Sequence, residues 1–257
     1  MNREYFAMMR DLIEAPVTSP RGMKTKELIG QHIFLDNPKA GLITLPGFET
    51  NLDYAEKELN WYLSGTNKLS GLGKFGKCWK FCSDDGMHVN SAYGHRIFGV
   101  HPKIKINQWQ WCLKKLTQDR DSRQCVINLN SEFDKHKKTK DFICTVFCQV
   151  LVRHERLHWL TYMRSTDAYL GVRNDIFCFA ALQRIMAHQL GIKIGKYHHF
   201  ASSLHLYEKQ FVKARKLVNS YDLVREIKNI YYPMNNIREL IKKYSDNLGG
   251  NKKWILK

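Results

Sequence analysis

DFICTVFCQVLVR (residues 141–153), YMRSTDAYLGVRNDIFCF (162–179) and SSLHLY (202–207) are the informative parts of one segment that organises this chain. Cys144 opens a run of apolar and β-branched residues, which is typical of a strand. A second apolar run, residues 157–163, follows the short turn sequence HER. The two runs are therefore predicted to form a β-hairpin.

The same segment carries a group of chemically active side chains. They are the thiol of Cys144, the guanidinium of Arg164, the carboxylates of Asp167 and Asp175, and the pair His205 and Tyr207. A cation and hydrogen-bonding groups can hold an anion, and a thiol is a strong nucleophile. The set suits a site that binds a small anionic ring compound and attacks it.

The remainder of the chain reads as support for this segment. Strands are predicted at 24–35, 125–129 and 197–207, and helices at 2–14, 54–64, 107–116, 175–190 and 206–218. The Gly- and Lys-rich residues 66–77 are expected to form a surface loop, and NSAYG (90–94) a polar turn. No repeat or linker divides the chain. We expect residues 1–257 to form one α/β (α+β) domain.

Composition favours a folded protein in a reducing compartment. The chain has 257 residues, of which 44% are hydrophobic and 12% aromatic. Its seven cysteines are an odd, scattered number, which favours reduced thiols over a disulfide framework. Two C-x3-C pairs lack a second ligand pair, so no metal site is expected. No apolar run approaches a membrane span, and the N-terminus lacks a signal-peptide pattern, so a cytoplasmic location is expected.

The net charge of +17 is the main compositional anomaly. It suggests a partner that carries phosphate: a nucleotide, a polyanionic cofactor, or nucleic acid bound without sequence specificity. A basic, solvated surface would give the same number. Charge alone does not choose between these interpretations.

Several motifs in one order resemble the thymidylate synthase superfamily, from Arg21 to Tyr207. They are ELNWYLSG (58–65), NSAYG (90–94), DSR (121–123), Cys144 with Gln149, MRSTDAYLG (163–171) and HLY (205–207). The resemblance implies a large twisted mixed sheet flanked by helices, and a homodimer joined through the sheet face. It also implies 5,10-methylenetetrahydrofolate as co-substrate and a pyrimidine nucleoside monophosphate as substrate.

The resemblance also assigns roles to residues. Cys144 would add to C6 of the pyrimidine, and Arg164 would bind phosphate and keep the thiol thiolate-like. Glu58 and Tyr93 would handle protons around the ring. The substrate would be held by Arg21, Gln149, Ser165, His205, Tyr207 and Arg123, the last from the other subunit. The folate would be contacted by Trp79, Asp167 and Gly171.

Four departures from the family pattern affect the interpretation. Gln124 stands where a second phosphate-binding arginine is usual, and Thr145 replaces a histidine after the nucleophile. The C-terminal NKKWILK does not match the apolar tail that closes over folate, so Trp254 is a weak candidate for a lid. RND (173–175) replaces Pro-Phe-Asn. VRND and DFICT instead resemble phage-type deoxycytidylate hydroxymethylases.

The replacement at Asp175 has a direct chemical meaning. The family asparagine donates to O4 of uracil and accepts from N3–H, whereas cytosine presents a donor at N4 and an acceptor at N3. Asp175 can accept from N4 and share a proton with N3, which makes C6 more electrophilic. We therefore expect Asp175 to favour (deoxy)cytidine monophosphate. The plainer alternative is that Asp175 caps the helix predicted after it.

Three functions follow in order of preference. The first is hydroxymethylation of (d)CMP at C5 through a Cys144–C6 adduct. The second is methylation or hydroxymethylation of dUMP. The third, prompted by the charge and by Gln124, is a non-catalytic nucleic-acid-binding protein that keeps the fold.

Overall fold

The computed structural model describes residues 1–132, 134, 138–220 and 231–250. Within these ranges the strands are β1 (Val17–Thr18), β2 (Thr25–Leu35), β3 (Val126–Asn128), β4 (Thr145–Arg153), β5 (Arg156–Met163), β6 (Thr166–Asp167) and β7 (Lys193–Tyr207). The α-helices are α1 (Asn2–Glu14), α2 (Leu52–Ser64), α3 (Tyr93–Phe98), α4 (Gln108–Gln118), α5 (Gly171–Gln189), α6 (Phe211–Asn219), α8 (Met234–Lys243) and α9 (Ser245–Leu248).

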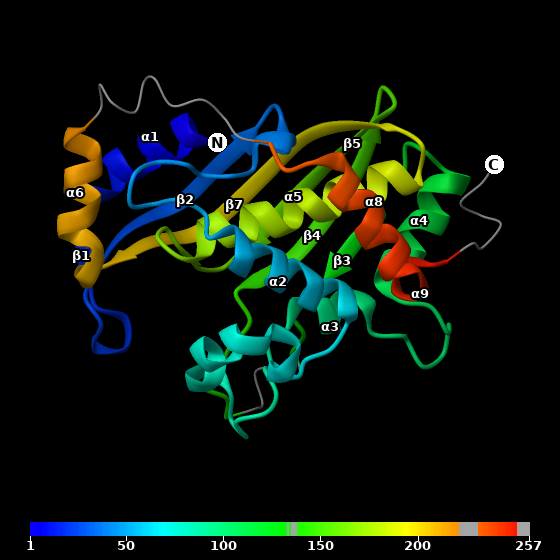
Figure 1. Cartoon of the computed structure of the whole chain (residues 1–257), viewed down its shortest axis with the longest axis horizontal. Helices are drawn as coiled ribbons and strands as arrows, with labels where there is room; N and C mark the ends of the chain where they lie inside the picture. Colours follow the sequence, from blue (N-terminus) through cyan, green and yellow to red (C-terminus); the bar gives the residue numbers. More distant parts are fainter. Residues whose placement is uncertain (133, 135–137, 221–230, 251–257) are drawn as a thin grey trace.

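The described strands form one mixed sheet in the order β1-β2-β7-β5-β4-β3, with β6 paired to β7. The β5–β7 and β6–β7 pairs are parallel and the others are antiparallel. Figure 1 shows α5, α2 and α8 in front of this sheet. The fold is therefore the α/β sheet with flanking helices that the sequence predicts.

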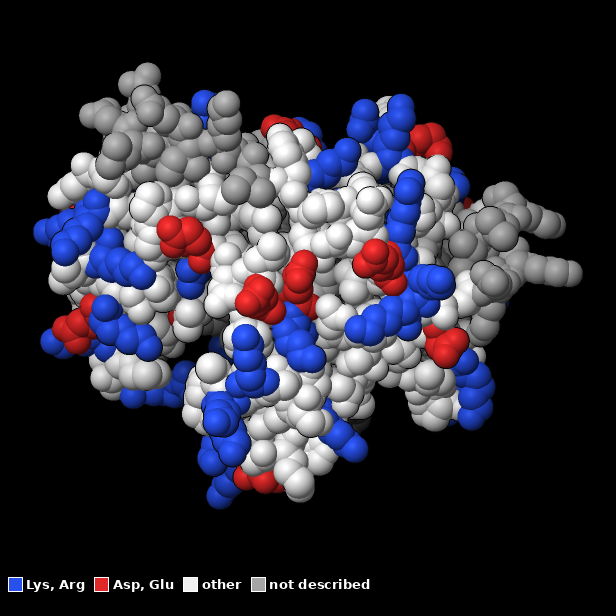
Figure 2. All heavy atoms as spheres, in the orientation of Figure 1, with Lys and Arg blue, Asp and Glu red and all other residues white. Residues whose placement is uncertain are grey.

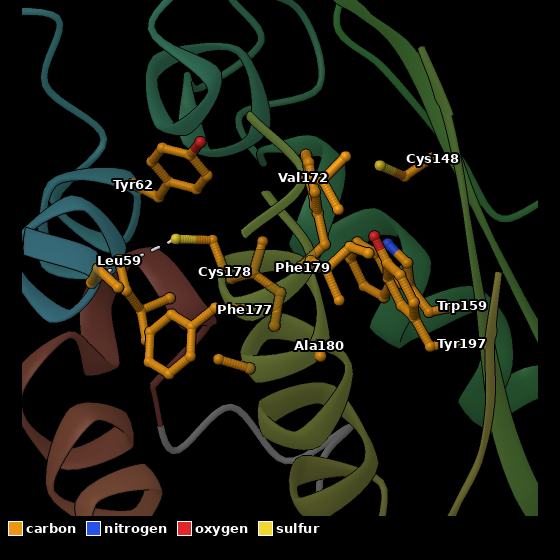
Figure 3. Packing of buried hydrophobic residues seen from close by; sticks show 14 of the residues in the cluster. Leu59, Tyr62, Cys148, Trp159, Val172, Phe177, Cys178, Phe179, Ala180 and Tyr197 are labelled. Atoms are coloured by element: carbon orange, nitrogen blue, oxygen red, sulfur yellow. Dashed lines mark hydrogen bonds between the residues drawn. The ribbon is translucent and has the colours of Figure 1, made fainter. Parts of the chain in front are cut away.

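Helix α5 is the centre of the core. It lies between the sheet, represented by Trp159 and Tyr197, and helix α2, represented by Leu59 and Tyr62 (Figure 3). All four side chains are at most 2% exposed. Because α5 is covered on both sides, nearly all of its residues from Val172 to Ala187 are apolar or buried.

The opposite face of the sheet carries a row of stacked rings. Phe200 stacks on His32 at 4.3 Å and on Tyr162 at 4.5 Å, and Tyr162 stacks on Phe147 at 4.3 Å. These residues alternate with buried strand neighbours such as Tyr197, which face α5. The row therefore presents an aromatic surface on the side of the sheet away from α5.

The predicted hairpin is confirmed, because β4 and β5 pair antiparallel across a two-residue turn. The expected loop at residues 66–77 is wrong. A 3-10 helix, η3, spans Leu69–Cys82. Glycine serves close packing there, since a Cβ at Gly71 would lie 2.5 Å from Trp61 Cδ1.

Two further boundaries differ from expectation. Tyr93 begins helix α3 instead of lying in a turn, and the next residue packs against α2 so closely that a Cβ at Gly94 would lie 2.1 Å from the Tyr62 carbonyl oxygen. Helix α5 begins at Gly171, four residues before the predicted start. Asp175 therefore lies inside the helix, and its interpretation as a helix cap is wrong.

Candidate active site

The sheet topology explains why distant motifs meet. Cys144 directly precedes β4 and Arg164 directly follows β5, and the antiparallel pairing places Thr145 opposite Met163. Strand β7 runs parallel to β5, so the C-terminal ends of both strands lie at the same end of the sheet as Cys144 and Arg164. The β4–β5 register also shifts between Thr145 and Phe147, an irregularity that often adjoins functional residues.

Arg164 holds Cys144 through backbone and side chain. The Arg164 amide donates to the Cys144 carbonyl oxygen at 2.9 Å, and its Nη2 lies 3.6 Å from Cys144 Sγ. Burial raises the pKa of the Cys144 thiol, and Arg164 opposes this effect while Asp175 adds to it. Burial is the larger effect. Arg164 thus acts in the direction expected from the resemblance, against the larger effect of burial.

Two buried carboxyl groups lie next to each other, Glu58 on α2 and Asp175 on α5, and the charge of Asp175 affects the Cys144 thiol. Glu58 is 3% exposed, and burial raises its pKa from 4.5 to about 7. Asp175 is 8% exposed, and burial followed by the charge of Glu58 raises its pKa well above the usual range. Two like charges cannot both be held there at low cost. Burial and the neighbouring Glu58 therefore both favour the protonated form of Asp175, and the pKa of Glu58 is about 7.

Tyr93 lies near Cys144, Glu58 and Asp175, and these four residues form the inner group of the site. The Tyr93 ring meets Tyr62 edge-on at 5.4 Å and stacks on Phe179 at 5.8 Å. Burial raises the pKa of its hydroxyl, and Asp175, Cys144 and Glu58 add to that shift through their negative charge. The phenol is therefore neutral and lies among the groups that the sequence predicts to be catalytic.

A second group lies at the end of β7. Asp167 pairs with His205 in the β6–β7 ladder, and its Oδ1 accepts from the amide of Tyr169 at 2.7 Å. Burial lowers the pKa of His205, which leaves the imidazole neutral, while Asp167 opposes the shift. The Tyr207 ring meets His205 edge-on at 5.1 Å, and its hydroxyl interacts with the Arg21 guanidinium. Arg21 is exposed and lies in the left-handed region, with φ 53°.

Two of the predicted folate residues, Trp79 and Gly171, lie in η3 and at the start of α5. Trp79 of η3 donates from Nε1 to the Tyr54 hydroxyl at 3.0 Å and packs against Trp61 at 5.6 Å. Gly171 is the first residue of α5, where a Cβ would lie 3.2 Å from Asp175 Oδ2. Gly171 therefore keeps the space in front of Asp175 open.

Three further residues predicted to bind the substrate are Arg123, Gln149 and Ser165. Gln149 Nε2 donates to the Arg123 carbonyl oxygen at 3.0 Å, and Gln149 lies on the same side of β4 as Phe147, the side with the stacked rings. Among the described residues, no hydrogen bond or ion pair joins Arg123 or Gln149 to Cys144. Ser165 is half-buried and follows Arg164. Trp254 lies outside the described residues.

Three neighbours of the site were not predicted from the sequence. Asp141 accepts from the Ser91 amide at 2.9 Å and raises the pKa of Cys144. Cys82, at the end of η3, is close enough to Cys144 and Arg21 for their charges to affect its own pKa. Tyr54 joins Trp79 to the surroundings of Glu58. Asp141 stands three residues before Cys144 in the sequence, and this proximity is the signal that could have identified it.

The molecular surface and the arrangement of polar side chains bear on the alternative functions. On the face shown in Figure 2, Lys and Arg form several small groups, with Asp and Glu between them. A continuous basic track of the kind that follows a nucleic-acid backbone is not visible on this face. Among the described residues, no cluster of three His, Cys, Asp or Glu side chains is arranged to hold a metal ion. In the same ranges, every helix is too short or too polar to cross a membrane.

Comparison with known proteins places these features in a family context. The family model described as thymidylate synthase matches residues 3–233. The deoxyuridylate hydroxymethyltransferase of Bacillus phage SP01 is 30% identical over 207 residues, which are 76% of this chain and 53% of that protein. The deoxycytidylate 5-hydroxymethyltransferase of Enterobacteria phage T4 is 31% identical over 165 residues, 62% of this chain and 63% of that protein. The chain thus spans about half of the first relative and under two thirds of the second.

Proposed function

Because this chain belongs to the thymidylate synthase family, we propose that it transfers a one-carbon unit to C5 of a pyrimidine nucleoside monophosphate. The preferred substrate is dCMP and the product is its 5-hydroxymethyl derivative. The balanced reaction consumes methylenetetrahydrofolate and water and releases tetrahydrofolate. The observation that supports the proposal is the buried Asp175, whose pKa burial raises, beside the Cys144–Arg164 pair.

Cys144 is the nucleophile in this proposal. Its sulfur forms a bond to C6 of the ring, and the thiol proton passes to water as that bond forms. The same S–C6 bond breaks when water adds to the new one-carbon group, which returns Cys144 to its thiol form. Arg164 favours the attacking thiolate through its positive charge. Arg21, Ser165 and Arg164 together hold the phosphate, and His205 and Tyr207 hold the sugar hydroxyl.

Asp175 recognises the base. A neutral carboxyl group can donate to N3 of cytosine and accept from the N4 amino group. Transfer of the Asp175 proton to N3 during attack makes C6 more electrophilic. A neutral carboxyl group can also pair with uracil, but N3 of uracil already carries a proton and gains no such activation. Discrimination is therefore expected in the rate of reaction more than in binding.

Glu58 and Tyr93 manage the protons at C5. With a pKa of about 7, Glu58 exchanges protons readily at neutral pH. Its Oε2 is buried and receives no hydrogen bond of normal geometry from the described residues, so this oxygen is available to a substrate group or a water molecule. Tyr93 lies close enough to Cys144 and Asp175 to assist removal of the C5 proton.

The residues around Trp79 fit a folate. A flat aromatic compound can pack on a half-buried Trp79, and the Asp167 carboxyl, whose pKa burial raises, can bond a pterin-type ring. When bound, methylenetetrahydrofolate supplies the methylene carbon. Trp79, Asp167 and Gly171 would position it, and the neighbouring Trp61 and Tyr54 fix the orientation of Trp79.

We further propose that residues 1–257 act as one cytoplasmic domain that pairs as a homodimer through the stacked-ring face. A row of stacked rings on one side of a sheet is the kind of surface that a second copy covers. The backbone carbonyl oxygen of Arg123 accepts from Gln149, which lies on that side of the sheet. Arg123 would reach the phosphate in the site of the partner.

The test uses dCMP and dUMP, each tritiated at C5, with methylenetetrahydrofolate. Tritium release with dCMP, without the absorbance rise of dihydrofolate, is the expected result. Release with dUMP and an equal rise in dihydrofolate would identify a thymidylate synthase instead. Release from neither nucleotide, with salt-sensitive retention of RNA or DNA, would favour the binding-protein alternative.

A second candidate is hydroxymethylation of dUMP. It is favoured by the similarity to the SP01 protein, whose name specifies deoxyuridylate, and by the ability of a neutral Asp175 to pair with uracil. In the same assay this activity gives tritium release with dUMP and no dihydrofolate.

A further inference from the structure

A chain of donors runs from the predicted folate residue Trp79 to the predicted proton carrier Glu58. Trp79 Nε1 donates to the Tyr54 hydroxyl at 3.0 Å. Tyr54 and Glu58 are four residues apart on α2, the spacing that places two side chains on one helix face. Tyr54 therefore lies between a ligand-facing ring and a buried carboxyl group.

The direction of this chain follows from the chemistry of its groups. The indole N–H can only donate, so the Tyr54 oxygen must accept from Trp79. The single hydroxyl proton of Tyr54 then points away from Trp79 and is free to face Glu58. The hydrogen bond that Trp79 donates to Tyr54 therefore fixes the direction of the Tyr54 hydroxyl proton.

Glu58 has few other groups that could stabilise its charge. Tyr62 donates to Glu58 Oε1 at the long distance of 3.4 Å, and Oε2 receives no hydrogen bond of normal geometry from the described residues. The hydroxyls of Tyr54 and Tyr62 both lower the Glu58 pKa against the larger effect of burial. The Tyr54 ring is also held by edge-on packing against Phe75 at 5.3 Å, so its hydroxyl is kept near this carboxyl group.

We propose that Tyr54 is a positioning residue that stabilises the ionised form of Glu58, with its orientation fixed by the N–H of Trp79. A ligand that moves Trp79 would thereby change the readiness of Glu58 to give up a proton. The coupling itself depends only on the three side chains. Its use in catalysis rests on the proposed function.

The experiment measures the protonation of Glu58 directly and without substrate. Protein labelled with ¹³C at the glutamate carboxyl carbon is titrated by NMR, and the Glu58 signal is the one missing from Glu58→Gln. In Tyr54→Phe the midpoint should rise by about one pH unit, because a hydrogen bond to a charged group is lost. In Trp79→Phe, which keeps an aromatic ring and removes the N–H, the midpoint should rise by a smaller amount.

Matched variants separate this role from packing. Tyr62→Phe should also raise the midpoint, since it removes the other hydroxyl beside Glu58. Tyr197→Phe removes a buried hydroxyl that interacts with Thr161 and His199, and should leave the midpoint unchanged. An unchanged midpoint in a folded Tyr54→Phe protein would overturn the proposal, as would equal shifts in Tyr54→Phe and Tyr197→Phe. Since no substrate is present, failure of the proposed reaction would leave these results intact.

Discussion

The Arg164 guanidinium lies 3.6 Å from the Cys144 sulfur, and the Arg164 amide bonds the Cys144 carbonyl oxygen at 2.9 Å. The two residues are thus fixed to each other by the ends of adjacent strands. Yet the pKa of the thiol is raised, since burial outweighs the nearby positive charge. In the proposed reaction, the thiolate of Cys144 would therefore form when the substrate binds.

The first prediction concerns the reactivity of Cys144. Alkylation by iodoacetamide should show an inflection above the ordinary thiol range, and Arg164→Met should move it higher by removing the opposing charge. Peptide mass spectrometry across a pH series measures each cysteine separately. The exposed Cys78 is the internal control and should behave alike in both proteins. An inflection for Cys144 within or below the ordinary thiol range would contradict this prediction.

The second prediction concerns the base. Asp175→Asn removes the carboxyl proton and restores an amide that pairs well with uracil. The ratio of kcat/KM for dCMP to that for dUMP should fall by about tenfold or more. Steady-state tritium release with both nucleotides measures the ratio. If the ratio stays constant while the protein remains folded, base selection lies elsewhere in the site.

The third prediction follows from the raised pKa of Glu58. Between 4.5 and about 7 the folded protein binds a proton that the unfolded chain has released, so stability falls as pH rises through this window. The loss is at most about 3 kcal/mol at the alkaline end and is absent below pH 4.5. Glu58→Gln should remove it. Urea denaturation at about pH 4.5 and about pH 8 measures the free energy of unfolding of both proteins. Relative to the natural protein, the variant should be more stable at the higher pH than at the lower pH.

The fourth prediction tests the shared site. Cys144→Ala and Arg123→Ala should each have little activity alone. When equal amounts are unfolded and refolded together, about half of the dimers are mixed, and each mixed dimer holds one intact site. Activity should recover to about a quarter of that of the natural protein. Recovery would not occur if Arg123 served the Cys144 of its own chain.

The sequence predicts most of the sheet because strand signals there are local. Alternation and the short HER turn suffice for the β4–β5 hairpin, and Gly65 marks the end of α2 with φ 67°. The 3-10 helix η3 could not be predicted in this way. Its glycines resemble a loop in sequence, whereas their use is close contact with Trp61, which only the folded chain supplies.

The candidate site also has features that the sequence predicts and features that only the folded structure shows. Motifs in a fixed order predict Cys144, Arg164 and Asp175 as site residues from the sequence alone, and the structure places them close together. The Trp79–Tyr54 bond joins residues 25 positions apart and has no motif of its own. The direction of the Cys144 pKa shift also could not be predicted from the sequence. It depends on the effect of burial relative to that of Arg164, and both effects are set by the three-dimensional structure.

The turn between β4 and β5 offers a handle for engineering. His154 and Glu155 both have left-handed φ values, 50° and 53°, a conformation that Asn-Gly adopts with less strain. The turn lies at the far end of a nine-residue strand from Cys144, about 30 Å away by strand geometry. A dye or an immobilisation tag attached there would leave the surroundings of Cys144 clear, so one labelled protein could serve both single-molecule imaging and ligand screening on a chip.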